Sequence, residues 1–484
     1  TCRFRSCSRS ATTNKENPVK LRSLIRFAFG LGLSGLVGLS VNLAAQEKGH
    51  SASEKTMEAF GKLKPLQDKK DWAGMRKLLE DLLPTVGKTS YDYVLIQDMR
   101  AKLFLQDDKL ALAIQPWEEA LKLSDQFKYF DEKYSNDIVL YLAQIIFSEA
   151  SGSTDRALQQ KNINRSLVYL KRYLAVAKKP TLETQMFYAQ LLYQQAAADP
   201  AHINQDLLKQ ARDVVEKGMA STIQPKEGFY MLRLAILQQQ NETQEAADQL
   251  ELMVSKFPSK KDFWPILMAT YLNLASQEKD PEKQRPFYIR AINALERAQK
   301  LGFMTTPKDN YNLVTIYITA GQFSRATDLL HAGLKSGAVE STVANWRVLG
   351  SYYQQANREI DAIKALQEAS SKFPKEGLLD LQMGEIFRQL EKTAEARDAY
   401  RRALAKGGLE KPQVAYQLLA YTSMELDDWN EAQRAIGEAA KHPDFAKDQQ
   451  MKSLKDHIDN TVREREEVRK LKEEASKKKT PASV

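Results

Sequence analysis

The chain has 484 residues and a formal net charge of +9 at neutral pH, with 43% hydrophobic and 27% charged residues. Residues 1–45 hold seven basic residues and one acidic residue, so most of the excess positive charge lies in this stretch, and the overall charge gives no argument for nucleic-acid binding. Both cysteines, Cys2 and Cys7, also lie there, so the sequence after residue 45 excludes disulfides, thiolate metal sites and a cysteine nucleophile.

Residues 19–45 have the three-part form of a secretory signal peptide. Three basic residues precede an uncharged stretch at 27–41, and two alanines ending at Ala45 follow it. We expect cleavage after Ala45 and export to the periplasm. The apolar stretch is about 15 to 18 residues long, shorter than the roughly 20 that a membrane-spanning helix needs. An uncleaved inner-membrane anchor that faces the periplasm is the alternative.

Residues 1–18 do not fit the start of a signal peptide, and we interpret them as an untranslated upstream segment. The pair Lys15-Glu16 can be encoded by AAG-GAG, a ribosome-binding sequence, and Val19 by a GTG start codon. This interpretation predicts a bacterial source. The basic, serine-rich residues 3–9 suggest an organelle transit peptide instead, but that reading leaves the apolar stretch and the alanine pair unexplained.

Residues 46–306 carry a degenerate helical repeat. Its markers are Phe104, Ala113, Trp117 and Ala120, then Tyr169, Leu170, Tyr173 and Leu174, then Ala211, Val215 and Gly218. A clearer unit spans 229–258 and ends in Ser-Lys-Phe-Pro, the tetrapeptide that recurs at 371–374. The next unit, 264–298, is longer, and Pro281 and Pro286 predict an inserted loop within it.

Residues 307–446 contain four well-defined units. The markers of one are Trp346, Leu349, Gly350, Tyr353, Ala362, Leu366, Ala369 and Pro374. The matching residues one period of 34 later are Asp380, Met383, Gly384, Phe387, Ala396, Tyr400 and Ala403. Neighbouring units repeat the pattern from Asn310 to Gly333 and from Tyr416 to Ala439. Small residues such as Gly350 allow two helices to approach closely, while Pro374 ends the second helix.

This pattern resembles the signature of tetratricopeptide repeats, strongly over residues 307–446 and more weakly before them. The resemblance implies an all-α fold, a right-handed superhelical α-solenoid of about nine to ten helical hairpins between residues 54 and 446. No run alternates with period two over the length of a strand, which also indicates the all-α class. We interpret the tryptophans at helical spacing as core residues, namely Trp117, Trp264, Trp346 and Trp429.

The sequence offers no pattern for catalysis, a metal or a cofactor. Gly30, Gly32 and Gly35 match a dinucleotide-binding spacing, but they lie in the predicted signal peptide without the strand and helix that such a site needs. The five histidines are scattered and have no partner at metal-ligand spacing. We therefore predict that the protein is not an enzyme.

Ligands of tetratricopeptide proteins generally lie along a concave groove lined by the first helix of each hairpin. By offset from the markers, the candidate groove residues are Tyr311, Thr315, Arg347, Ser351, Gln354, Gln355, Glu385, Arg388, Gln389, Gln417, Tyr421 and Glu425. This mixed, amide-rich surface suits an extended peptide, with Arg347 and Arg388 available for carboxylates. An ordinary solvent-facing surface is the alternative. Tyr311, Thr315 and Val348 replace the residues of the family's chaperone-tail clamp, so an Hsp70 or Hsp90 adaptor is not expected.

Residues 447–484 are predicted to form a helix whose apolar first half caps the last repeat. Beyond Arg463 the sequence is nearly all charged, and we expect its end to be disordered.

Together these features predict an exported scaffold for protein–protein interactions in a cell-envelope complex. The layout is similar to that of tetratricopeptide accessory proteins of TonB, ExbB and ExbD systems, and export machinery is a further candidate. Membrane contact is expected only through envelope partners or an uncleaved anchor. Two alternatives are a carbohydrate- or peptidoglycan-binding module, which needs exposed Tyr311 and Tyr421, and an enzyme, which needs converging Glu385 and Glu425.

Overall fold

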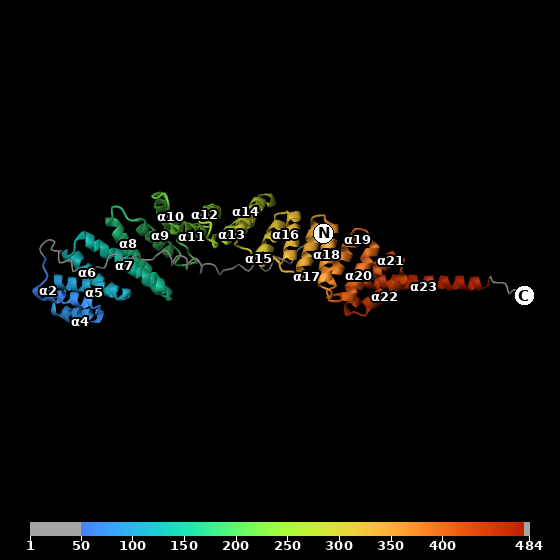
Figure 1. The fold of residues 1–484 in the computed structure, drawn as a ribbon, viewed down its shortest axis with the longest axis horizontal. Coiled ribbons are helices and arrows are strands. Elements are labelled where there is room, and N and C mark those ends of the chain that lie inside the picture. The colour runs from blue at the N-terminus through green and yellow to red at the C-terminus, as the bar shows by residue number, and fades with distance from the viewer. Residues whose placement is uncertain (1–49, 479–484) are drawn as a thin grey trace. The chain divides into compact units, whose positions relative to one another are not determined.

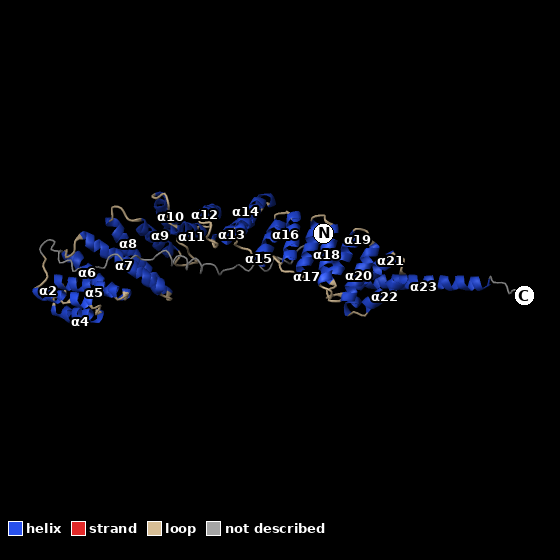
Figure 2. Cartoon of the chain, viewed as in Figure 1, coloured by secondary structure: helices blue, strands red, loops and turns tan. Residues whose placement is uncertain are grey.

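The computed structural model describes residues 50–478, and within this range the chain is helical and contains no strand (Figures 1 and 2). The predicted all-α class is therefore confirmed. The predicted upstream segment and signal peptide, at 1–18 and 19–45, lie outside the described residues. None of the helices described has both the length and the apolar character needed to cross a membrane.

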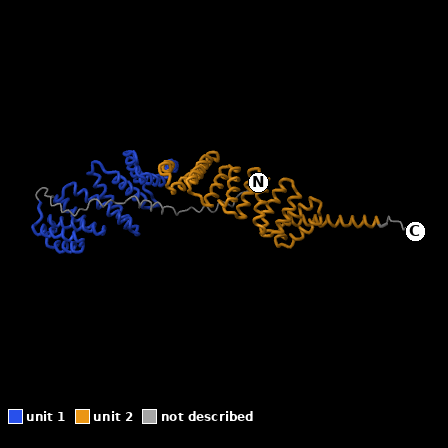
Figure 3. Tube along the Cα trace, in the orientation of Figure 1, with its two compact units in different colours: residues 1–249 blue, residues 250–484 orange. Residues whose placement is uncertain are grey.

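The chain divides into two compact units, residues 1–249 and 250–484 (Figure 3). Unit 1 contains α2 (Glu54–Gly61), α3 (Leu63–Asp68), α4 (Trp72–Leu82), the short 3-10 helix η3 (Leu83–Thr85), α5 (Tyr91–Gln106), α6 (Leu110–Phe127), α7 (Glu132–Gly152), α8 (Arg156–Val176), α9 (Leu182–Ala196), α10 (Gln205–Ala220) and α11 (Glu227–Gln239). The division falls within α12 (Thr243–Lys256).

Unit 2 continues the succession of helices. It contains α13 (Phe263–Gln277), α14 (Pro281–Lys300), α15 (Pro307–Thr319), α16 (Phe323–Ser336), α17 (Val343–Gln355), α18 (Glu359–Lys372), α19 (Leu378–Gln389), α20 (Thr393–Lys406), α21 (Pro412–Glu425), α22 (Trp429–Ala440), the 3-10 helix η4 (Pro443–Lys447) and α23 (Gln449–Lys478). Within the described residues α5 to α22 form nine successive pairs, in agreement with the predicted nine to ten hairpins. In unit 2 the two helices of each pair from α13 to α22 pack on one another, as stacked repeats require.

A left-handed backbone residue closes the turn between the two helices of several hairpins. In unit 2 these residues are Gly321, Asn357, Glu391 and Asp427, with φ between 55° and 73°. Glycine and asparagine tolerate this region well, whereas a longer L side chain strains it. Glu391 is therefore the least suitable residue of the four.

We predict that Glu391→Asn stabilises the protein by about 0.5–1 kcal/mol, because it relieves this strain without adding the unfolded-state entropy of glycine. The reciprocal change Asn357→Glu places glutamate in the same turn one repeat earlier, where φ is 55°. It should destabilise the protein by a similar amount. Urea unfolding of both variants measures the two effects, and equal midpoints for both would contradict the strain argument.

The predicted loop around Pro281 and Pro286 is wrong. Asp280 caps the helix by accepting a hydrogen bond from the Glu282 amide at 3.0 Å, and Pro281 occupies the first turn, where no amide partner is needed. Pro286 lies inside α14, near its beginning. The extra residues thus lengthen a helix.

The large apolar residues that recur at repeat spacing form the core. Trp117, Trp264 and Trp346 are at most 2% exposed, as predicted. Trp429 is only partly buried: it packs beside the cluster of α20 to α23, and Arg465 lies 4.9 Å from its ring centre. Its indole N–H donates to the Asp427 carboxylate at 2.7 Å.

The helix predicted after residue 447 is present and extends to Lys478. Met451, Ile458 and Val462 are buried in the cluster that also contains Leu419, Ile436 and Ala439 of the last hairpin. From 463 to 476 every residue is exposed, and α23 runs out of the end of unit 2 (Figure 1). Residues 479–484, where disorder was expected, lie outside the described part.

Candidate functional site

The candidate residues lie on the first helices of the last four hairpins, α15, α17, α19 and α21. We call the outward surface of these helices the A-helix face; the predicted residues that define it are Tyr311, Thr315, Arg347, Ser351, Gln354, Gln355, Glu385, Arg388, Gln389, Gln417, Tyr421 and Glu425. All twelve are exposed or half-buried. The repeat spacing therefore places them outside the core, as their choice assumed.

Side-chain amides join α17 to α19 across this face. The Gln354 amide nitrogen donates to the Gln389 oxygen at 2.9 Å. Gln382, which is 8% exposed, donates from its amide nitrogen to the Arg347 carbonyl oxygen at 3.1 Å and to the Ser351 hydroxyl at 3.2 Å. These contacts fix the register of the two helices and leave the remaining polar atoms at defined positions.

Arg347 and Arg388 are exposed and, within the described residues, form no ion pair. Arginines near the second helices of the same hairpins do form such pairs. Arg325 lies 3.7 Å from Glu296, Arg358 contacts Asp328 at 2.8 Å, and Arg402 contacts Asp380 at 3.0 Å. The cations of the A-helix face are thus available to a ligand carboxylate.

Glu385 on α19 is influenced by the charges of both cations. It is exposed to solvent, yet burial of its carboxyl by surrounding protein atoms raises its pKa above the ordinary value. The charges of Arg347 and Arg388 act in the opposite direction. A carboxyl that neighbouring side chains surround on several sides can still touch water, so the two observations are compatible. Both arginines must therefore lie near the same carboxyl, although neither forms an ion pair with it.

The raised pKa gives a pH-dependent prediction for Glu385→Gln. Folding disfavours the charged carboxylate, and this cost is absent below the unfolded-state pKa and fully present above the folded-state pKa. The variant should therefore be more stable than the parent at about pH 7 and equally stable at about pH 3. Urea unfolding at both values tests this. A larger stabilisation at the acidic value would contradict the sign.

The Tyr400 hydroxyl lies beneath the A-helix face. Its side chain on α20 is fully buried, and the hydroxyl has no hydrogen-bond partner in the structure. Its pKa is raised to about 12, mainly by burial; the Arg388 charge lowers this pKa, and the Glu385 and Glu425 charges raise it. The charges of these three residues on α19 and α21 therefore act on one hydroxyl.

A tyrosine lies at each end of the face, and the two differ in exposure. Tyr421 on α21 is 39% exposed, whereas Tyr311 on α15 is half-buried. Burial raises the pKa of Tyr352, and Tyr311 adds to this effect, so the two phenols are neighbours on α15 and α17. Thr315 donates to the Tyr311 carbonyl oxygen at 3.0 Å within its own helix.

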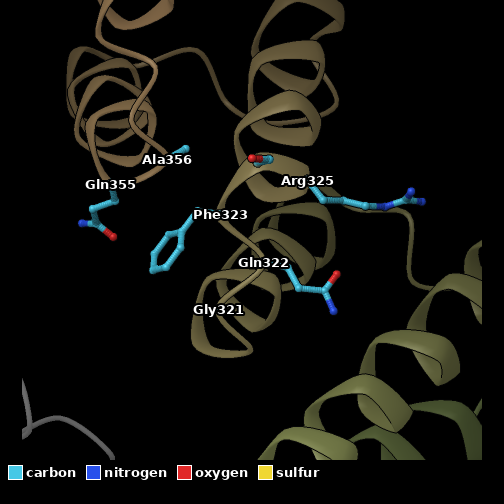
Figure 4. A pocket seen from close by; sticks show the side chains of 7 residues that line it. Gly321, Gln322, Phe323, Arg325, Gln355 and Ala356 are labelled. Atoms are coloured by element: carbon cyan, nitrogen blue, oxygen red, sulfur yellow. The ribbon is translucent and has the colours of Figure 1, made fainter.

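An open hollow of about 360 Å³ lies beside the turn between α15 and α16 (Figure 4). Its lining is Gly321, Gln322, Phe323, Ser324, Arg325, Gln355 and Ala356. Among the candidate residues only Gln355, at the end of α17, belongs to it. The Arg325 side chain points away from the Phe323 ring in the figure, so the hollow does not gather converging charges.

Sequence reasoning missed Gln382 and Tyr400. Both are buried, and each has an unpartnered polar atom, the Gln382 amide oxygen and the Tyr400 hydroxyl. Gln382 directly precedes the marker Met383 on α19. The repeat pattern does not specify the residue type at position 382, so it gave no reason to single out this glutamine. The repeat pattern makes Tyr400 a core residue, which is correct for its ring. The pattern gives no information about the partner of its hydroxyl.

Within residues 50–478 no cluster of three or more histidine, cysteine or acidic residues is arranged to hold a metal ion.

Comparison with known proteins gives distant structural likenesses. No protein-family model and no curated protein matches the chain. The APC/C hetero-tetramer Cut9–Hcn1 is 14% identical, with 82% of this chain and 76% of that chain covered and a TM-score of 0.25. A tetratricopeptide repeat protein from Parabacteroides merdae is 11% identical over 58% and 98% of the two chains, with a TM-score of 0.27. MamA is 18% identical over 38% and 95%, with a TM-score of 0.28. At such TM-scores the tetratricopeptide assignment rests on the signature residues and the hairpins they form.

Proposed function

We propose that the protein is an exported scaffold that holds an extended segment of a protein partner along the A-helix face of unit 2. The partner belongs to a cell-envelope assembly, for which a TonB-type energy-transducing system and an export system are the candidates. The protein acts by binding, without catalysis.

One contrast carries this proposal. Several charged side chains near the second helices are used inside the protein, as in the pair of Arg402 with the fully buried Asp380. Those of the A-helix face, Arg347 and Arg388, have no such partner although the face itself is tied together by Gln354, Gln382 and Gln389. An ordered surface that retains unused polar groups suits a peptide with backbone amides and charged side chains.

Export is supported by the predicted signal peptide at 19–45. A periplasmic location follows from it, with membrane contact through envelope partners or through an uncleaved anchor. The neutral balance of the repeat body gives no reason to propose a nucleic acid as partner.

A carbohydrate- or peptidoglycan-binding function is the second candidate, and the exposure of Tyr421 favours it. An exposed phenol provides the flat surface on which a sugar ring packs. The half-buried Tyr311 offers a smaller surface of this kind at the other end of the face.

The proposal is tested by recovering partners of the tagged protein from crosslinked envelope fractions and identifying them by mass spectrometry. Arg347→Glu with Arg388→Glu should leave the fold intact, because both side chains are exposed and form no ion pair, and should reduce recovery of the partner at least about tenfold. Arg434→Glu, at an exposed arginine of α22 whose guanidinium donates to the Asn430 carbonyl oxygen, is the control. Equal recovery with the double variant contradicts the site. Recovery of glycan fragments alone favours the second candidate.

A further inference from the structure

The polar groups around Glu385 form one small cluster on α17, α19 and α20. Arg388 lies one turn from Glu385 on α19, and Arg347 is on α17, where its carbonyl oxygen accepts from Gln382 of α19. The charges of both arginines act on the Glu385 carboxyl. Gln382 and Glu385 are three residues apart on α19 and therefore share one side of that helix. The cluster combines two cations without ion pairs and one carboxyl.

Two buried polar atoms in the cluster have no hydrogen-bond partner. The Gln382 amide is held in place by the Arg347 carbonyl oxygen and the Ser351 hydroxyl, and its own oxygen is left unpartnered. The Tyr400 hydroxyl is likewise unpartnered and is affected by the charge of Arg388. Buried polar atoms are nearly always hydrogen-bonded, so two unused atoms in one place indicate a capacity that a ligand completes.

The kind of ligand follows from the charges. Arginine binds carboxylates through a planar fork of donors, and two arginines near one point favour an acidic group over an uncharged one. The Glu385 carboxylate repels an acidic group. Replacing Glu385 by glutamine should therefore strengthen the binding of an acidic ligand. A basic ligand would instead depend on Glu385 and be repelled by both arginines.

We propose that this cluster binds an acidic side chain of an extended polypeptide, with Arg347 and Arg388 contacting its carboxylate and the Gln382 oxygen available to a peptide N–H. The inference rests on the proposed scaffold function and adds the chemistry of the bound segment.

The experiment is a selection of random dodecapeptides displayed on phage against the intact chain. Four proteins are compared: the parent, Arg347→Gln with Arg388→Gln, Glu385→Gln, and Arg434→Gln as the control outside the face. We expect Asp and Glu to be enriched in the peptides selected by the parent and by the control. The double variant should lose this enrichment. A selected acidic peptide should bind the double variant at least about tenfold more weakly, and Glu385→Gln more tightly, than it binds the parent.

Peptide pools without acidic enrichment, or equal affinity for the parent and the double variant, would overturn the inference. So would weaker binding of an acidic peptide by Glu385→Gln. Far-ultraviolet circular dichroism confirms that each variant is folded before selection. The envelope recovery experiment separates the two proposals. If the glutamine double variant still recovers the protein partner, the scaffold function stands and the acidic segment is contradicted. If the parent recovers no protein partner, the scaffold function itself is contradicted.

Discussion

Replacing Asp380 by alanine is expected to destabilise the protein by about 3 kcal/mol, because it removes a buried carboxylate on which three side chains converge. Asp380 is fully buried at the start of α19. It accepts from the Lys406 ammonium at 2.8 Å, the Arg402 guanidinium at 3.0 Å and the Ser370 hydroxyl at 2.8 Å. Lys406 and Ser370 belong to successive hairpins, so the carboxylate ties α18 to α20.

The alanine variant leaves Lys406, which is 20% exposed, without its anion. Urea unfolding of the intact chain measures the loss, and hydrogen exchange should show it first in α18 to α20, since stacked repeats open locally. Asp398→Ala is the matched control. That carboxylate also contacts an arginine, Arg401 at 3.0 Å, but is 53% exposed, so its removal should cost at most about 0.5–1 kcal/mol. Equal effects of the two substitutions would contradict the role of burial.

Gly384→Ala is expected to destabilise the protein by about 1–3 kcal/mol through overpacking. A Cβ atom at this position would lie 2.4 Å from Cε1 and 2.6 Å from Cδ1 of Tyr400. The Tyr400 ring is fully buried between the helices and cannot move without displacing its neighbours. The added methyl group therefore separates α19 from α20.

Gly437→Ala on α22 is the control for this substitution. No atom lies within 4 Å of its Cβ position, so alanine gains helix propensity without a steric cost and should stabilise the protein by about 0.5–1 kcal/mol. Thermal unfolding of both variants gives opposite shifts if packing at Gly384 is the cause. A shift of the same sign in both would contradict the argument.

The well-defined repeats could be predicted from sequence because each marker residue has one steric task. Gly350 is an example, since a Cβ there would lie 3.0 Å from Leu366 Cδ1 across the hairpin. The buried Tyr400 ring fills the space that Gly384 leaves. A period of 34 repeats these tasks, and the period is visible without a structure.

Other features depend on pairs that no single repeat contains. Asp380 occupies the position that Trp346 occupies one period earlier. The burial of Asp380 could therefore be predicted from the repeat, but its ion pairs with Lys406 and Arg402 could not. In one repeat Lys372 lies 4.8 Å from the Trp346 ring centre, and its counterpart Lys406 forms the ion pair with Asp380. The same position thus serves an aromatic ring or a carboxylate, according to the residue it meets.

The candidate site was predictable only as a set of outward positions. Spacing placed Arg347 and Arg388 on the first helices, but it could not show that they lack ion pairs while Arg402 has one. Nor could it show the unpartnered atoms of Gln382 and Tyr400, because hydrogen bonding depends on side-chain orientation across three helices. The loop predicted around Pro281 and Pro286 is wrong for another reason, since Asp280 caps the helix and a proline is compatible with its first turn.

Site-specific photo-crosslinking tests the central claim most directly, that a protein partner lies along the A-helix face. A benzophenone amino acid is placed at Ser351 on α17 and, as the control, at the exposed Lys364 on α18, in cells of the source organism. A discrete protein adduct at Ser351, absent at Lys364 and lost with Arg347→Glu and Arg388→Glu, is the predicted result. The same adducts at both positions, or none at Ser351, would contradict the account.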